Sequence, residues 1–315
     1  MNKYEAYRKQ WEEAGNGKIK TEWPTDCTIE LASVCDSRCI FCPVTPNYEK
    51  RESLFPVRFM KFGLFKKIID EISGHVLSIK LQYRGESTLH KEFNKFCDYA
   101  AQAEFIERMI NTNGNYHESK REGLYKLDKI IFSIDSLIKE KYEKIRKGLS
   151  FLKLMKNFGH AVMRYQNEGK PKIKVNMTIT KDNKDEIEQF RQFFNPEIVE
   201  LRQAPVFSRT PNAKDYSLNL QIIGRKNCKY PSQRQIILHS GLVLPCCAKW
   251  EAEKSDIILG DASKQNIYDI WHNKKTDDLQ ITAIRSNYSK YKACMNCEVW
   301  PSYEVIDRDK LYGLY

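Results

Sequence analysis

Three cysteines stand close together near the start of the chain, Cys35, Cys39 and Cys42, with the spacing C-x3-C-x2-C. Three thiolates on one short loop can bind three irons of a cubane cluster and leave the fourth iron without a protein ligand. An open iron can bind a reactant, whereas a cluster closed by four cysteines only carries electrons. Zinc loops prefer C-x2-C pairs with a fourth ligand. The spacing therefore predicts a 4Fe–4S cluster with chemistry at its open iron.

A second group of cysteines lies in the last third of the chain, at Cys228, Cys246, Cys294 and Cys297, with Gly241 before Cys246. The chain contains ten cysteines, and a reducing cytosol keeps clustered thiols free to bind metal. Four ligands close a cluster completely, which predicts an electron relay or a structural centre. A structural zinc site with four cysteines also fits the spacing.

Six predicted strands alternate with helical segments, of which Phe62–Ile72 and 90–103 are amphipathic. This order predicts a parallel α/β sheet with right-handed crossovers, either open or curved into part of a barrel. Chemistry in such folds is located at the carboxyl ends of the strands. The predicted strands are Thr28–Ala32, Val76–Tyr83, Ile106–Asn111, Ile130–Ile134, Ile173–Thr180 and Ile198–Ala204.

The C-terminal part differs in kind. Ser240-Gly241 separates two short apolar runs, 235–238 and 242–245, and predicts a hairpin, while 266–284 predicts a helix. So thin a core needs support, which a metal centre can supply. The predicted domains are an N-terminal helical extension (1–26), the barrel (27–206), a linker (207–227) and an auxiliary-cluster domain (228–315).

The first cysteine cluster and the residues around it resemble the radical S-adenosylmethionine superfamily over about residues 26–206. The resemblance implies a partial (β/α)6 TIM barrel in which Phe41 shields the adenine and Gly85-Glu86 hold the methionine amine. Ser87 stands where the family usually has proline. The resemblance also implies that Ser133 and Asp135 bind the ribose or the methionine carboxylate, and that Asn113 lies at a similar height in the barrel.

The second cysteine cluster resembles the SPASM/twitch extension, in the form with a single auxiliary 4Fe–4S cluster. The resemblance implies two 4Fe–4S clusters and a flavodoxin- or ferredoxin-type electron donor. It also implies reductive cleavage of S-adenosylmethionine to methionine and a 5′-deoxyadenosyl radical. The chain is thus expected to be a radical S-adenosylmethionine oxidoreductase or epimerase.

Among such enzymes the chain is similar to those acting on sugars and cyclitols, such as the 2-deoxy-scyllo-inosamine dehydrogenases. This implies oxidation or epimerisation of a sugar, cyclitol or nucleotide-sugar. Arg202 is a candidate for orienting the substrate or accepting a proton. Gln82, Arg84 and Asn176 are further candidates for lining the cavity. Only about 26 residues precede the first strand, too few for a winged-helix leader-binding domain, yet a peptide maturase or epimerase remains the alternative. An Fe–S electron-transfer or RNA-modifying protein is a further alternative.

Three cysteines remain outside both clusters. Cys246 and Cys247 are adjacent, and adjacent residues of a strand point to opposite faces, so Cys247 is not expected to share the metal. It is either a small buried residue or a thiol that returns a hydrogen atom to a substrate radical. Cys27 and Cys97 are predicted core residues.

The formal net charge is +11, which suits either a phosphorylated substrate or a solvated surface. Lysine and glutamate are mixed throughout, as in Glu140–Arg146, which favours a solvated surface and gives no basic stripe for nucleic acid. The sequence has neither a secretory signal nor an apolar run long enough for a membrane span. A cytoplasmic enzyme without a membrane partner is expected.

Overall fold

The computed structural model describes most of the chain, in which nine strands form one sheet in the order β12-β11-β10-β1-β3-β4-β5-β7-β8. Six of these strands follow one another in the chain as parallel neighbours, which confirms the predicted partial (β/α)6 barrel. They are β1 (Asp26–Ile29), β3 (Ser78–Lys80), β4 (Glu107–Thr112), β5 (Lys129–Ser133), β7 (Lys172–Ile179) and β8 (Val199–Pro205). The described residues are 2–42, 58–206, 215–218, 222–247, 253, 255–295, 297 and 303–305.

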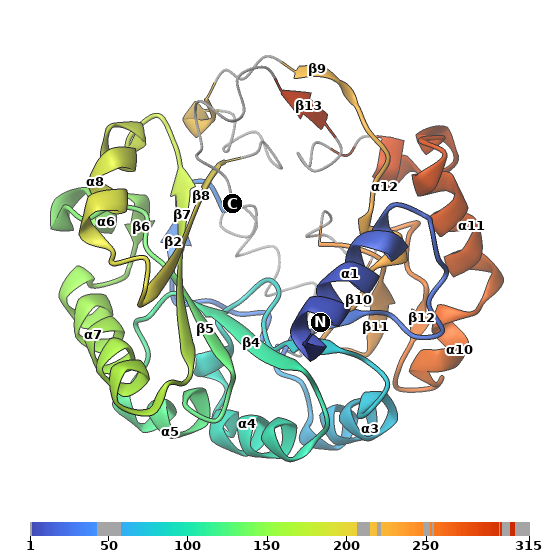
Figure 1. The fold of residues 1–315 in the computed structure, drawn as a ribbon, viewed down its shortest axis with the longest axis horizontal. Coiled ribbons are helices and arrows are strands. Elements are labelled where there is room, and N and C mark those ends of the chain that lie inside the picture. The colour runs from blue at the N-terminus through green and yellow to red at the C-terminus, as the bar shows by residue number, and fades with distance from the viewer. Residues whose placement is uncertain are drawn as a thin grey trace.

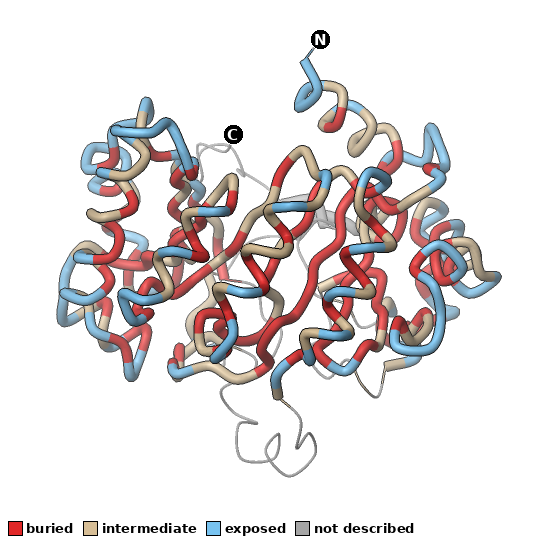
Figure 2. The backbone as a smooth tube through the Cα atoms, turned by 90° about the horizontal axis from the view of Figure 1, so that it is seen from below, coloured by how far each residue is buried: buried red, intermediate tan, exposed pale blue. Residues whose placement is uncertain are grey.

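Helices cover the outside of the curved sheet, as Figure 1 shows. The predicted helix Phe62–Ile72 is present with the same bounds, and its buried side chains face the sheet. Seen from below, the strands are buried while the outer sides of the helices are exposed (Figure 2). The covering helices are α3 (Phe62–Ile72), α4 (Phe93–Gln102), α5 (Arg121–Leu124), α6 (Lys139–Ile145), α7 (Phe151–Glu168) and α8 (Ile187–Phe193).

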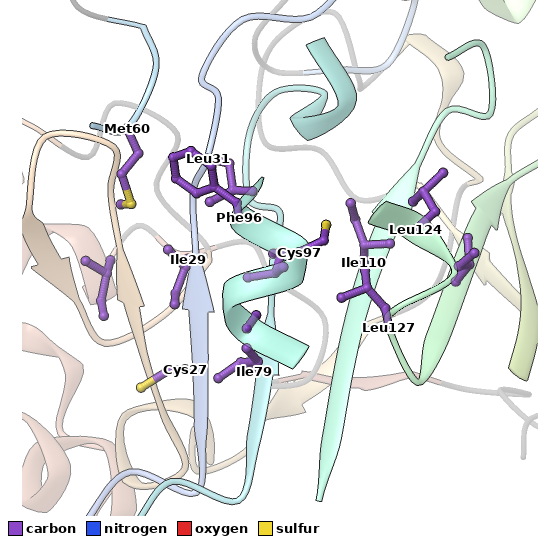
Figure 3. Close-up of a cluster of buried hydrophobic side chains, with 14 of the residues drawn as sticks. Cys27, Ile29, Leu31, Met60, Ile79, Phe96, Cys97, Ile110, Leu124 and Leu127 are labelled. Atoms are coloured by element: carbon purple, nitrogen blue, oxygen red, sulfur yellow. The ribbon is translucent and has the colours of Figure 1, made fainter. Parts of the chain in front are cut away.

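The main core lies between the sheet and these helices. Ile29, Ile79 and Ile110 point from their strands towards α4, with Phe96 and Cys97 on the helix (Figure 3). Cys27 and Cys97 are fully buried in this core, as predicted. Since side chains alternate along a strand, the residues between these apolar ones point to the opposite face, which we call the inner face.

Helix α1 (Lys3–Gly15) lies at the amino-terminal end of the strands. The Tyr7 hydroxyl is 3.1 Å from Oγ of Ser78, the first residue of β3, and both are buried. Asn2 begins the helix with a capping box, in which its side chain accepts a hydrogen bond from the Glu5 amide. The N-terminal extension thus closes the end of the barrel opposite to the one where chemistry is expected.

The C-terminal hairpin joins the barrel sheet. Strand β10 (Arg234–Ile237) pairs in parallel with β1, and β11 (Leu242–Leu244) and β12 (Gly260–Asp261) continue the sheet in antiparallel fashion. The apolar residues of this segment, expected to form a thin core, therefore continue the core of the barrel. Gly241 forms the turn with a φ of +98°, a conformation that L side chains rarely adopt.

The helix predicted over 266–284 is divided in two. Helix α10 (Ile267–Trp271) ends before Asn273, whose side chain accepts a hydrogen bond from the Thr276 amide and so caps α11 (Lys274–Ile284). Trp271 is buried, and its ring nitrogen donates to the Thr21 carbonyl. The remaining elements are β2 (Arg38–Cys39), β6 (Arg146–Lys147), β9 (Ile222–Arg225), α12 (Lys292–Met295) and β13 (Tyr303–Val305). Most of the predicted linker lies outside the described residues.

Within the described ranges, no helix is both long and apolar enough to cross a membrane.

Candidate active site at the carboxyl ends of the strands

The first cysteine cluster lies on the loop that follows β1. Cys35 and Cys42 are half-buried, Cys39 is buried, and none of the three forms a disulfide. The Cys42 amide donates to the Cys39 carbonyl at 3.1 Å, which turns the chain between these two thiols. Cys39 lies in β2, which pairs with β6, so the loop is held against the segment that follows α6.

The Gly85-Glu86 loop packs directly against this cysteine loop. The Glu86 amide donates to the Val34 carbonyl at 2.8 Å. A Cβ atom on Gly85 would lie 2.2 Å from the Val34 carbonyl oxygen and 2.5 Å from that of Ala32. Because no real side chain tolerates such contacts, only glycine lets the two loops approach this closely. The structure therefore gives Gly85 a steric role in placing Cys35.

Glu86 is buried and connects β3 with the end of β4. Its Oε2 accepts from the Asn113 amide at 2.7 Å, and its Oε1 accepts from the hydroxyls of Thr88 and Thr112 at 2.7 and 3.1 Å. Burial raises the pKa of the Glu86 carboxyl, although the bonds from Asn113 and Thr88 oppose that rise. The Asn113 side chain donates to Asp36 at 2.7 Å, which ties the cysteine loop to β4 as well.

Arg146 faces the buried thiol of Cys39. Its Nη1 lies 3.7 Å from Sγ of Cys39, and its Nε donates to Asp135 at 2.7 Å. Burial raises the pKa of the Cys39 thiol to about 11, and the charge of Arg146 counteracts part of this rise. Ser37 Oγ is 3.0 Å from the same sulfur. A buried cation beside a thiol fits a site that must hold thiolate or an anionic cluster.

The structure places Asp135 differently from the expectation of a direct cofactor contact. This carboxylate is fully buried, and its two oxygens accept from Arg146 and from the Thr178 amide at 2.7 Å. It therefore positions Arg146. Arg146 itself was missed, because the sequence Glu140–Arg146 reads as a solvated helix surface, yet the structure buries its guanidinium. Burial of an arginine cannot be seen from such a local charge pattern.

The first cysteine loop fits a cubane cluster. Within the ranges the structure covers, no three metal-ligating groups are close enough to hold a single metal ion. Three free thiols on one loop are the donor set of a cubane, in which each thiolate binds a different iron. Phe41 lies beside the loop, half-buried, with its ring 5.8 Å from the Arg146 guanidinium carbon. Ser133 lies at the end of β5, in register with Asn176.

The second set of cysteines lies on the helix side of the hairpin. Cys246 is buried in the main core, and Cys294 of α12 packs against the same core. The Cys297 amide donates to the Cys294 carbonyl at 3.1 Å, and the Cys228 amide donates to the end of α11 at Ala283, at 3.2 Å. The hairpin, the segment before it and the ends of these helices carry the four thiols that would be the donor set for a closed cluster.

Cys247 points the other way. It packs with Ile236, Leu238 and Leu244, a small cluster separate from the core that contains Cys246, and Tyr83 joins it there. Ile236 alternates with Ile237, which belongs to the main core, so Cys247 lies with the inner face of the sheet. The two adjacent thiols therefore occupy opposite sides, and Cys247 lies towards the inside of the barrel.

Of the other candidates, Arg202 is exposed on β8, in register with Asn176 of β7. Oδ1 of Asn176 is buried without a hydrogen-bond partner in the described part of the chain. Asn176 thus presents an unsatisfied polar atom beside the exposed Arg202, as a substrate site requires.

Arg84 does not line a cavity, contrary to the prediction. Its guanidinium is buried and bound by two carboxylates, Glu30 at the end of β1 and Glu253 of the C-terminal segment. Nη1 and Nη2 donate to Glu253 at 2.9 and 2.6 Å. Nδ1 of His239, in the hairpin turn, lies 2.8 Å from Glu30. These four residues join the loop before Gly85 to the C-terminal segment.

Comparison with known proteins agrees with this arrangement. Residues 228–298 match the SPASM family model, described as an iron-sulfur cluster-binding domain. Over 277 residues the chain is 23% identical to the S-adenosyl-L-methionine-dependent 2-deoxy-scyllo-inosamine dehydrogenase of Niallia circulans, covering 85% of this chain and 90% of that protein.

Two solved structures share the fold. BtrN in complex with AdoMet and 2-DOIA superposes with a TM-score of 0.55 at 18% identity, covering 89% of this chain and 95% of that one. Streptococcus suis SuiB superposes with a TM-score of 0.65 at 17% identity, covering 88% of this chain and 71% of that one. Identities this low establish the shared architecture alone.

Proposed function

Since this chain is a radical S-adenosylmethionine enzyme of the SPASM/twitch group, with S-adenosylmethionine and two 4Fe–4S clusters as cofactors, we propose that it oxidises an alcohol carbon of a small polar substrate. The substrate class would be a sugar, cyclitol or nucleotide-sugar. One observation carries this proposal: the similarity to the 2-deoxy-scyllo-inosamine dehydrogenase spans 85% of this chain and 90% of that protein.

The residues around the first cysteine cluster would bind the cluster and S-adenosylmethionine. Cys35, Cys39 and Cys42 would hold the S-adenosylmethionine cluster. Oε2 of Glu86 accepts a single hydrogen bond among the described residues, from the Asn113 amide, and would bind the methionine amine. When bound, this cluster and its cofactor supply the radical that removes a hydrogen atom from the alcohol carbon. The remaining contacts to the cofactor would come from Phe41, Gly85, Asn113 and Ser133, with Asp135 acting through Arg146.

Oxidation of an alcohol removes two hydrogens, so one proton and one electron must leave after the first hydrogen atom. The electron would pass to a cluster held by Cys228, Cys246, Cys294 and Cys297, and the proton to solvent. Arg202 would orient the substrate, because a guanidinium stays protonated in proteins and cannot accept a proton. A flavodoxin- or ferredoxin-type protein would supply the reducing electron for S-adenosylmethionine cleavage. The predicted domain limits and cytoplasmic location remain predictions.

The test is an anaerobic reaction of the reconstituted enzyme with cyclitols and sugars that carry deuterium at single alcohol carbons. Transfer of label into 5′-deoxyadenosine, together with a ketone product, is the expected result. The double variant Cys294→Ala/Cys297→Ala should still cleave S-adenosylmethionine but form no ketone. Label transfer without ketone formation by the wild-type enzyme would show that the enzyme does not oxidise.

Epimerisation is the second candidate, favoured by the position of Cys247 at the inner face. A thiol there could return a hydrogen atom to the opposite face of a substrate radical. Such a reaction leaves the oxidation state of the substrate unchanged and needs no electron acceptor. The thiyl radical left on Cys247 would return to the thiol by taking one electron from the external donor and one proton from solvent.

A further inference from the structure

The inner face of the barrel carries a lysine without a counter-ion. Lys80 is the last residue of β3, and it alternates with Ile79, which faces α4 (Figure 3). Its neighbours in register are Thr28 of β1 and Met109 of β4. Within the part of the chain that the structure covers, the Lys80 amine has neither a hydrogen-bond nor an ion-pair partner, although the side chain is half-buried.

Other lysines on the same inner face are paired. Lys129 of β5 lies 2.7 Å from Glu107, and Lys174 of β7 forms an ion pair with Glu200. These pairs neutralise the lysines of β5 and β7. Lys80 therefore differs from Lys129 and Lys174, because no carboxylate of the described residues forms an ion pair with it.

Two arginines add to the charge around Lys80. Arg234 of β10 is two residues before Ile236 and therefore lies on the same face. The positive charges of Arg234 and of Arg202 on β8 both disfavour the protonated form of Lys80. Asp26, the one carboxylate among the charged neighbours of Lys80, accepts from Ser78 Oγ at 2.9 Å and lies 3.9 Å from Arg234 Nε. Burial, and after it the charge of Arg234, lowers the pKa of Lys80 to about 8.

The Arg234 guanidinium is held in place yet incompletely satisfied. Its central carbon lies over the Tyr230 ring, 4.7 Å from the centroid. Its Nε is buried and makes no hydrogen bond with the described residues. Lys80 and Arg234 are half-buried cations with one carboxylate, Asp26, between them, and such an arrangement is costly unless an anion enters the site.

We propose that Lys80, together with Arg234 and Arg202, binds a phosphate ester of the substrate at the inner face of the barrel, beside Cys247. Cys247 packs against Ile236, whose register partner Thr28 is also the partner of Lys80. The anion would thus anchor one end of the substrate and leave the other end free towards the cysteine loop. This inference rests on the proposed function and narrows its substrate class to phosphorylated sugars, cyclitols or nucleotide-sugars.

The experiment is a calorimetric titration of the reconstituted enzyme, saturated with S-adenosylmethionine, with inorganic phosphate. We expect Lys80→Gln and Lys80→Met to weaken phosphate binding at least about tenfold, the loss of one charge-assisted hydrogen bond. Lys80→Arg should retain binding. Lys156→Gln, the same charge change on the exposed side of α7, should leave the affinity at its wild-type value.

Unchanged phosphate affinity in Lys80→Gln and Lys80→Met would overturn the inference. The same holds if these variants bind phosphate normally but shift the reduction potential of the auxiliary cluster, because the cations would then serve that cluster. The titration needs no turnover, so its failure is distinct from failure of the proposed oxidation. If a neutral cyclitol is oxidised as fast as its phosphate ester, the proposed oxidation is supported and the proposed anion site is contradicted.

Discussion

Arg84 holds Glu30 through two hydrogen bonds, 2.6 Å from Nε to Oε1 and 2.8 Å from Nη2 to Oε2, in a place where neither side chain meets solvent. Although burial alone raises it, Arg84 and His239 hold the pKa of Glu30 well below its ordinary range. Arg84 directly precedes the Gly85-Glu86 loop, and it also binds Glu253. The loop at the first cysteine cluster is thereby coupled to the C-terminal segment.

Replacing Arg84 with Met should be strongly destabilising. It leaves the buried Glu30 with His239 alone and removes the cation bound to Glu253, and breaking a buried pair from one side costs about 3–5 kcal/mol. Arg164→Gln, which breaks the surface pair with Glu168 on α7, should cost less than about 1 kcal/mol. Thermal unfolding of the cluster-loaded proteins compares the two. Equal losses of unfolding free energy in both variants would show that the buried Arg84 contact stabilises the protein no more than a surface ion pair does.

Removal of the first cysteine cluster should abolish S-adenosylmethionine cleavage. We expect about eight irons per chain in the reconstituted enzyme and about four in Cys35→Ala/Cys39→Ala/Cys42→Ala, because each cubane holds four. Iron analysis measures the iron content, and an assay of 5′-deoxyadenosine measures the cleavage of S-adenosylmethionine. Cys97→Ala, in the core of α4, should keep the full iron content and activity. Reductive cleavage by the triple variant would contradict the assignment.

Replacing Arg146 with Met should lower the reduction potential of the S-adenosylmethionine cluster. Arg146 offers a cationic hydrogen bond to Sγ of Cys39, and such a bond stabilises the more negative, reduced cluster. A change on the order of 50 mV corresponds to about one kcal/mol for one electron. A redox titration followed by electron paramagnetic resonance measures it, with Arg164→Gln as control. A potential that does not move would leave Arg146 with a packing role.

Replacing Cys247 with Ala separates oxidation from epimerisation. If the enzyme oxidises its substrate, the variant should form ketone at close to the wild-type rate. An epimerase would instead keep producing 5′-deoxyadenosine while losing the inverted product and its solvent deuterium. Mass spectrometry of the products in deuterated buffer distinguishes the two, and Cys27→Ala serves as the control thiol.

The affinity of the inner-face site for sulfate, an anion that does not titrate near neutrality, should fall as the pH rises. Lys80 has a pKa of about 8, so it is charged below that value and neutral above it. An anion binds the charged form, so affinity should drop about tenfold between pH 7 and pH 9. Lys80→Gln should show a flat profile. The charges of Asp26, Arg234, Arg202 and Cys247 also influence the pKa of Lys80. Cys247→Ser is therefore a control for the thiol, and we expect it to keep the wild-type dependence of sulfate affinity on pH.

The sequence alone determined the chemistry and the outline of the fold. Cysteine spacing is a local property, and so are the alternation of strands and the 3.6-residue period of Phe62–Ile72, which the structure reproduces with the same bounds. Cys246 and Cys247 pack in two different clusters, as the alternation of adjacent residues predicts, although both follow the end of β11. Each of these follows from residues that are near one another in the chain.

Only the tertiary structure decided which charges are buried and with whom. Arg146 and Glu30 look like ordinary solvated residues in their local sequence, yet both are buried, because their partners lie on other elements. Glu253 reaches Arg84 across 169 positions of the chain. Lys80 has no ion-pair partner among the described residues for the same reason, since Asp26, the carboxylate on the neighbouring strand β1, is bound by Ser78 and lies close to Arg234. The hairpin joined the barrel sheet because β1 presents a free edge to β10, a long-range pairing that local periodicity does not encode.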